Sequence, residues 1–128
     1  MIYIFGGLMM YQQDWLMRQI EAFAAAIARI VLGKAEVSYE IQDEANHTET
    51  DMLYLRLNEL LNDGNINAAE DLLFERIKAG DTNYFLLALD FYQRLNDKSD
   101  DELEHSSFSR EEIETGLFEV MSIFGVKI

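Results

Sequence analysis

The 128-residue sequence contains neither cysteine nor proline. Without cysteine the chain can form no disulfide, no thiolate nucleophile and no cysteine-based zinc site. Without proline, no predicted helix has to break at one. Basic residues are also scarce, because 10 Lys and Arg stand against 24 Asp and Glu, for a formal net charge of −14. Nucleic acids and anionic lipids would be repelled by such a surface, so we expect neither as a partner.

The residues that are present suffice for one folded domain. The hydrophobic fraction is 49%, which is ordinary for a globular protein and too high for a disordered chain. A chain of this size buries roughly two thirds of its extended surface on folding, which is enough for a stable core. We therefore expect a single domain over residues 1–128. No catalytic motif identifies an activity, so we expect no enzyme and no cofactor.

The amino-terminal region lacks the signals for export or membrane insertion. Residues 1–10, MIYIFGGLMM, have neither the positive charge nor the small-residue cleavage site of a signal peptide. Residues 11–32 are about as long as a membrane span but carry four charges, and each costs roughly 2.5–3.5 kcal/mol at mid-bilayer. We therefore expect a cytoplasmic protein. Met9 and Met10 stand directly before the first charged sequence, which makes residues 1–9 a doubtful N-terminal extension.

Residues 10–34 are predicted to form an amphipathic helix. Five large apolar residues recur at gaps of 4, 3, 4 and 3, which places them on one stripe of a helix. Trp15 widens this stripe, and the alanines between favour a helix that a second helix could approach closely. Gly33 followed by Lys34 is a helix stop signal. The stripe consists of Leu16, Ile20, Phe23, Ile27 and Ile30.

Residues 35–48 show a different pattern. Val37, Tyr39 and Ile41 alternate with polar residues, and this period of two is typical of extended backbone. A short strand and an extended connector both fit the pattern. Because a single strand without a partner contributes little stability, we predict a connector that lies along the helical body.

Residues 49–125 are predicted to form helical hairpins. Turns at 62–65 and 79–82 separate three helices, and turns this short make consecutive helices antiparallel neighbours. Gly64 suits the left-handed position of the first turn. Ser99 and Ser109 each begin a capping-box sequence, which predicts a short helical turn and then a last helix ending at Gly125. Candidate N-caps of the three earlier helices are Thr48 or Thr50, Asn65, and Asp81 or Thr82.

Two segments resemble a known family. Residues 11–21, YQQDWLMRQIE, are similar to the N-terminal signature of DUF6483, a bacterial family of unknown function found mainly in Gram-positive species. Residues 108–113, FSREEI, with Gly116 and Leu117, are similar to the C-terminal region of that family. The resemblance covers most of residues 10–125. It implies no reaction and assigns no functional residue.

A second resemblance concerns one hairpin. Gly64, Ala69 and Leu73 are similar to the middle of a tetratricopeptide repeat, where a tight turn leads into a helix with a small packing residue. The characteristic proline is missing, and Asp81 stands near its place. One unit matches, whereas a repeat array needs about three. We therefore predict an all-α fold of five main antiparallel helices, with an N-terminal amphipathic helix and tetratricopeptide-like hairpins.

The two histidines suggest a metal site as an alternative function. Each follows a glutamate at a distance of three residues, in the pairs Glu44 and His47, and Glu102 and His105. Di-iron helix bundles use two such motifs, because this spacing puts both ligands on one face of a helix. Both pairs lie in polar connector sequence, however, and in so acidic a chain the spacing arises readily by chance. A metal-binding helical-bundle enzyme is therefore the alternative hypothesis.

The first helix supports the leading hypothesis. Residues 11–34 carry a net charge of +1, beside a strongly acidic remainder. We predict a non-enzymatic protein that works through protein–protein contact, most simply as a homodimer. Packing of the same stripe into the protein's own core is the other interpretation that its pattern allows. The predicted contact residues are Trp15, Leu16, Ile20, Phe23, Ile27 and Ile30.

Overall fold

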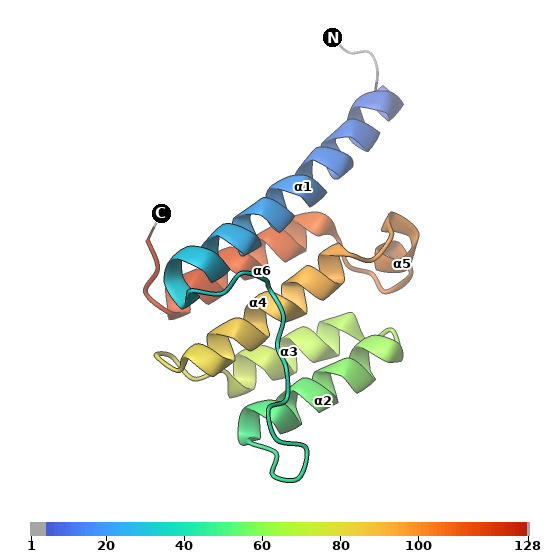
Figure 1. The fold of residues 1–128 in the computed structure, drawn as a ribbon. Helices are drawn as coiled ribbons and strands as arrows, with labels where there is room; N and C mark the ends of the chain where they lie inside the picture. Colours follow the sequence, from blue (N-terminus) through green and yellow to red (C-terminus); the bar gives the residue numbers. More distant parts are fainter. Residues whose placement is uncertain (1–4, 128) are drawn as a thin grey trace.

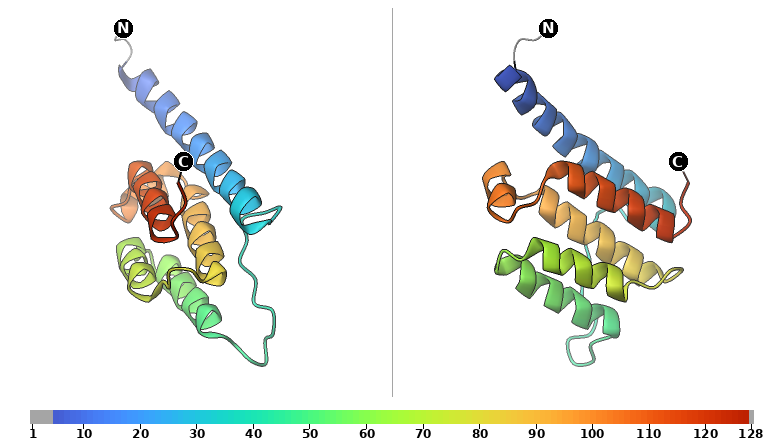
Figure 2. Two further views of the ribbon diagram at one scale, coloured as in Figure 1. Left: turned by 90° about the vertical axis from the view of Figure 1, so that its left-hand side faces the viewer. Right: turned by 180° about the vertical axis from the view of Figure 1, so that it is seen from behind.

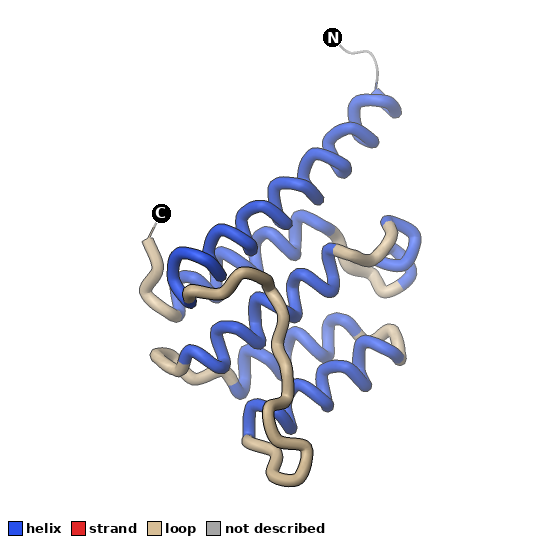
Figure 3. Tube along the Cα trace, viewed as in Figure 1, coloured by secondary structure: helices blue, strands red, loops and turns tan. Residues whose placement is uncertain are grey.

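The computed structural model describes residues 5–127, with side chains from Gln13 onward. Within this range the chain forms six helices and no strand (Figure 3), which confirms the predicted all-helical class. Five helices are long, and α5 is the short helical turn expected after Ser99. The helices are α1 (Phe5–Leu32), α2 (Glu49–Asn62), α3 (Ile66–Arg76), α4 (Thr82–Asn96), α5 (Asp100–His105) and α6 (Arg110–Ile123).

Helix α4 is the centre of the bundle. It packs against α1 and α6 on one side and against α2 of the α2–α3 hairpin on the other (Figures 1 and 2). Its sequence, TNYFLLALDFYQRLN, is apolar around most of its circumference, as a helix with neighbours on several sides requires. The buried α4 residues are Tyr84, Phe85, Leu87, Ala88, Leu89, Asp90, Phe91, Tyr92, Leu95 and Asn96.

Side-chain caps fix where several helices begin. Of the paired candidates, Thr48 caps α2 and Asp81 caps α4. Both predicted capping boxes form, at Ser99 before α5 and at Ser109 before α6. Asn65 precedes α3 as predicted, but its side chain accepts no capping hydrogen bond. The four side-chain caps, at Thr48, Asp81, Ser99 and Ser109, satisfy backbone N–H groups that have no partner within the helix.

Residues 33–48 connect α1 to α2 and contain neither helix nor strand. This connector crosses α4 in Figure 1 and is fixed there by Tyr39. The Tyr39 backbone N–H donates to Asp90 Oδ2 at 2.8 Å, and its hydroxyl donates to the Asp51 carboxylate. Val37 and Ile41 are half-buried beside it. The period of two therefore reflects one side of an extended strap packed on helices, and the alternative strand does not form.

Helix α1 begins at Phe5, five residues before the predicted start. Its amino-terminal turns project beyond the other helices in Figures 1 and 2. Of the doubtful extension, residues 1–4 lie outside the described residues, and a translation start near Met10 stays a prediction. Neither α1 nor another helix in the described part of the chain has the length and apolar character needed to cross a bilayer.

Candidate interaction surface on the first helix

The inner face of α1 lies in the protein's own core. Leu16, Ile20 and Ile27 expose only 7%, 2% and 6% of their surface, and α1 contacts α4 and α6. Ala24 and Ala28 are fully buried between them, which lets the helices approach closely. The prediction that Leu16, Ile20 and Ile27 contact a second subunit is therefore wrong. These side chains are already removed from water within one chain, so they leave almost no exposed surface for a partner.

Phe23 marks the edge of this buried face. Its ring is half-buried and packs edge-on against the ring of Phe118 in α6, with centroids 5.3 Å apart. Phe118 is itself 46% exposed. The pair therefore closes the α1–α6 contact on the solvent side, and Phe23 belongs mainly to the packing between these two helices.

The opposite side of α1 has no partner among the described residues. Trp15 and Ile30, both predicted contact residues, are 60% and 81% exposed. Ala22 is exposed and Ala26 half-exposed between them, at successive gaps of seven, four and four residues from Trp15 to Ile30. At 3.6 residues per turn, these gaps keep all four residues on one side of the helix, where the exposed Gln19 is the polar member. We call Trp15, Ala22, Ala26 and Ile30 the outer face of α1.

Hydrophobic spacing alone does not separate this outer face from the core stripe. Trp15 and Ile30 lie at the margins of the five-residue apolar stripe. One broad stripe therefore includes both the buried residues and the outer face. The alanines do not distinguish the two sides, because Ala22 and Ala26 continue the Trp15–Ile30 side while Ala24 and Ala28 continue the buried one. Only the positions of α4 and α6 beneath α1 decide which side is buried.

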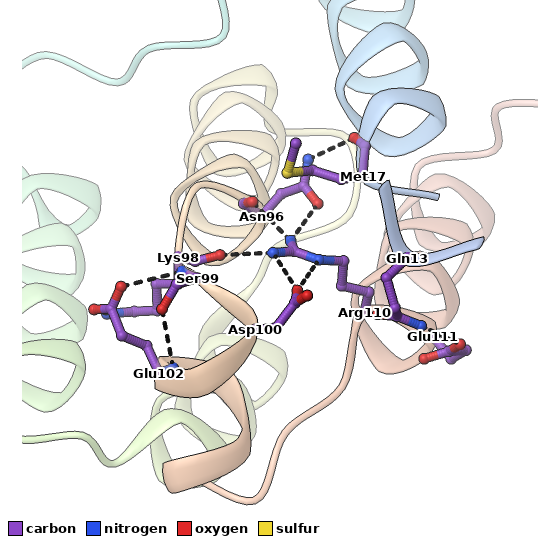
Figure 4. A network of polar contacts seen from close by, with 9 residues as sticks. All are labelled: Gln13, Met17, Asn96, Lys98, Ser99, Asp100, Glu102, Arg110 and Glu111. Atoms are coloured by element: carbon purple, nitrogen blue, oxygen red, sulfur yellow. Dashed lines mark hydrogen bonds and ion pairs between the residues drawn. The ribbon is translucent and has the colours of Figure 1, made fainter. Parts of the chain in front are cut away.

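A buried arginine holds α1 against its neighbours (Figure 4). The Arg110 guanidinium donates to the backbone oxygens of Asn96 and Lys98, at 2.8 and 2.7 Å, and to Asn96 Oδ1 at 3.0 Å. Asn96 Nδ2 in turn donates to the Met17 backbone oxygen at 2.8 Å. Asp100 pairs with the guanidinium at 3.0 Å. This network joins α1, α4 and α6, and it fixes the direction in which the outer face points.

The charge of α1 differs from that of the remaining chain. Asp14 and Glu21 balance Arg18 and Arg29, so the residues after Leu32 carry the whole net charge of −14. Arg18 and Asp14 lie 3.5 Å apart at the surface, and such exposed pairs contribute little to stability. The outer face is therefore an apolar strip on a neutral helix, attached to an acidic body.

The two Glu-x-x-His pairs do not come together. Glu44 and His47 lie in the connector with a 3.2 Å contact, whereas Glu102 and His105 belong to α5. Glu102 is already used in the capping box of Ser99. Within residues 5–127, no three His, Asp or Glu side chains gather in a way that could hold a metal ion. The arrangement that the alternative enzyme hypothesis requires is therefore not formed by these pairs.

The fold and this surface define a small all-helical protein with an apolar helix face directed to solvent. The model of a family of unknown function, DUF6483, matches residues 10–125, and the chain belongs to this family. This match confirms the resemblance drawn from residues 11–21 and 108–113. Neither a curated protein nor a solved structure gives a significant match.

Proposed function

We propose that this protein is a non-enzymatic interaction module that self-associates through the outer face of α1. The observation that carries the proposal is the exposure of Trp15 and Ile30, at 60% and 81%, on one side of a helix whose other side is buried. Large apolar side chains that stay exposed to water in the monomer lower the free energy when they cover one another in a dimer.

The spacing of the outer face suits a symmetric pair of helices. Trp15 and Ile30 are separated by about 22 Å along the axis at 1.5 Å per residue. Ala22 and Ala26 leave a shallow space between these two larger side chains. In an antiparallel pair with its two-fold axis near Ala22, Trp15 of each copy would lie beside Arg29 and Ile30 of the other. An indole ring accepts both an aliphatic side chain and a guanidinium on its face.

Charge also favours α1 as the contact between two copies. Two bodies that carry −14 repel each other, so association is least unfavourable where the contact surface has no net charge. Helix α1 meets this condition and lies at the edge of the helical layers in Figure 2. In the antiparallel arrangement Asp14 of one copy also approaches Arg29 of the other, which adds opposite charges near each end.

The expected affinity is modest. Burying a large apolar side chain contributes roughly 1.5–3 kcal/mol, and a dimer would bury two from each copy. The four side chains together contribute about 6–12 kcal/mol, whereas association costs about 4–15 kcal/mol in lost freedom. The dissociation constant is therefore micromolar at the tightest, and we take about 10 μM as the expected value.

Sedimentation velocity over protein concentrations from about 1 to 300 μM tests this proposal, because the range brackets the expected dissociation constant. The parent protein should shift from monomer to dimer, and Trp15→Glu combined with Ile30→Glu should stay monomeric. Met52→Glu is the matched control, since Met52 on α2 is 62% exposed but lies outside α1. A parent that remains monomeric throughout, or an equal loss of dimer in Met52→Glu, would contradict the proposal.

The α2–α3 hairpin packs in the way expected of a tetratricopeptide-like hairpin. The two helices pack as antiparallel neighbours, and Gly64 in the turn between them has a φ of +78°. Ala69 and Leu73 are fully buried, in keeping with the small and apolar positions of a tetratricopeptide-like hairpin. We propose this likeness for the packing of one hairpin, without a repeat array.

A further inference from the structure

A second surface lies on the opposite side of α4 from α1. A groove of about 620 Å³ runs between α2 and α3 and reaches the start of α4. Leu53, Leu72 and Tyr84 contribute apolar surface to its lining, and Met52 beside them is 62% exposed. Leu53 and Tyr84 are almost completely buried, so they form a fixed floor, whereas the Met52 thioether side chain can adapt to a bound group.

The rim of this groove is basic, in contrast to the remaining surface. Arg56, Arg76 and Lys78 line it, which is three of the ten basic residues in the chain, against the single carboxylate of Glu49. By comparison, the hollow between α3 and α6 is lined by four carboxylates and no basic residue: Glu70, Asp71, Glu112 and Glu119. The groove lining therefore joins an apolar floor to three cations and one carboxylate, while Glu59 and Glu75 lie beside Arg56 and Arg76 outside the lining.

The rim cations are held only by weak pairs. Lys78 lies 2.9 Å from Glu49, and their hydrogen bond lowers the pKa of Glu49 and raises that of Lys78. Arg56 lies 3.3 Å from Glu59. Arg76 lies 3.9 Å from Glu75, and all six side chains are more than half exposed. Exposed pairs of this kind contribute about 0–1 kcal/mol, so a carboxylate from outside can replace the internal one at little cost.

We propose that this groove docks a segment of a partner protein in which acidic residues flank a large apolar side chain. The apolar side chain would cover Leu72, Tyr84 and Met52, and the flanking carboxylates would pair with Arg56 and Arg76. At physiological ionic strength the Debye length is about 8 Å, so cations at contact range outweigh the more distant carboxylates of the body. Arginine pairs carboxylates and phosphates alike through two parallel hydrogen bonds, so it is the apolar floor of the groove that favours an acidic peptide over another polyanion.

The experiment uses the whole chain labelled with ¹⁵N and three acetylated, amidated hexapeptides. DELFDE has the proposed chemistry, NQLFNQ keeps the apolar pair without charge, and KKLFKK reverses the charge. At 0.15 M salt, DELFDE should shift the amide signals of Met52, Leu72, Lys78 and Tyr84, and should bind at least about tenfold more tightly than either other peptide. An oligothymidylate of equal charge tests whether any polyanion suffices.

Variants locate the contact. Arg56→Glu with Arg76→Glu should weaken DELFDE binding at least about tenfold, because both exposed arginines reverse their charge. Lys34→Glu with Lys127→Glu, the same charge change at two exposed positions outside both α1 and the groove, should leave binding unaltered. Equal binding of DELFDE and NQLFNQ, equal binding of the oligothymidylate, signal shifts centred elsewhere, or no binding at millimolar peptide would each overturn the proposal. None of these results depends on the oligomeric state of the parent protein.

Discussion

Helices α4 and α1 are both rich in apolar residues, but they use them differently. Helix α4 has neighbours on several sides and buries ten residues, two of which, Asp90 and Asn96, are polar and hydrogen-bonded. Helix α1 lies at the edge, covers α4 and α6 with one face, and leaves Trp15 and Ile30 exposed. An apolar residue therefore stabilises the monomer only where a neighbouring helix covers it. Apolar residues on the uncovered side of α1 are available for a partner.

Removing the arginine that joins these helices should have the largest effect. Arg110 is 3% exposed, and its loss would leave Asn96 and the carbonyl of Lys98 without their donors. We expect Arg110→Ala to lower the free energy of unfolding by about 3–5 kcal/mol, measured by urea denaturation, because it leaves buried acceptors unsatisfied and an unfilled space. Arg18→Ala removes the same side chain from the exposed side of α1 and should cost less than about 0.5 kcal/mol. Equal effects of the two substitutions would contradict the claim that the buried arginine stabilises the fold more than the exposed one.

A cavity in α4 should cost somewhat less. Leu89 is completely buried, and we expect Leu89→Ala to lower the free energy of unfolding by about 2–5 kcal/mol through lost contacts and an unfilled cavity. Leu55 on α2 is 38% exposed, and the same truncation there should cost about 1 kcal/mol or less. Urea denaturation of both variants measures the difference, and similar midpoints would show that α4 is packed less tightly than its burial indicates.

The contributions of two carboxylates, Asp51 and Glu70, to the free energy of unfolding should change in opposite directions with pH. Hydrogen bonds from the Tyr39 hydroxyl and the Thr48 backbone N–H lower the pKa of Asp51. Its stabilising contribution is therefore present above the ordinary value of 3.8 and is lost as pH falls through the lowered pKa. We expect Asp51→Asn to be less stable than the parent at pH 7, and the gap between them to narrow at acidic pH.

Glu70 provides the opposite case. Burial, more than any other cause, raises the pKa of Glu70, although the Tyr92 hydroxyl donates a hydrogen bond to it at 2.6 Å. Its favourable contribution is full below the ordinary value of 4.5 and is lost as pH rises through the raised pKa. Gln cannot ionise, so Glu70→Gln should lose less stability than the parent as pH rises above 4.5. Thermal unfolding from about pH 2 to 7 measures both variants, because the Asp51 contribution changes below 3.8 and the Glu70 contribution above 4.5. Parallel pH profiles for the two would contradict this account.

The smallest effect on monomer stability should come from the outer face of α1. Trp15→Ala and Ile30→Ala should each change the free energy of unfolding by less than about 0.5 kcal/mol at concentrations below the expected dimerisation range. Urea denaturation at about 1 μM measures this, since a dimer of the proposed affinity is dissociated there. A loss of several kcal/mol would mean that these side chains are covered within the monomer, which would remove the contrast with α4.

The sequence by itself determined the helical class, most of the helix starts and the family. Hydrophobic spacing and capping residues such as Thr48, Ser99 and Ser109 act within a few residues of one another, so they can be read along the chain. The match to residues 10–125 likewise follows from the sequence alone.

Only the tertiary structure decided which side of α1 is covered, that Arg110 is buried, and that the two Glu-x-x-His pairs remain separate. Each of these depends on elements far apart in the chain. Ile27 and Ile30 belong to one stripe by spacing, yet one is 6% exposed and the other 81%, because α4 and α6 lie beneath only one of them. Periodicity gives the angle of a residue around its helix, whereas burial depends on where the neighbouring helices pack.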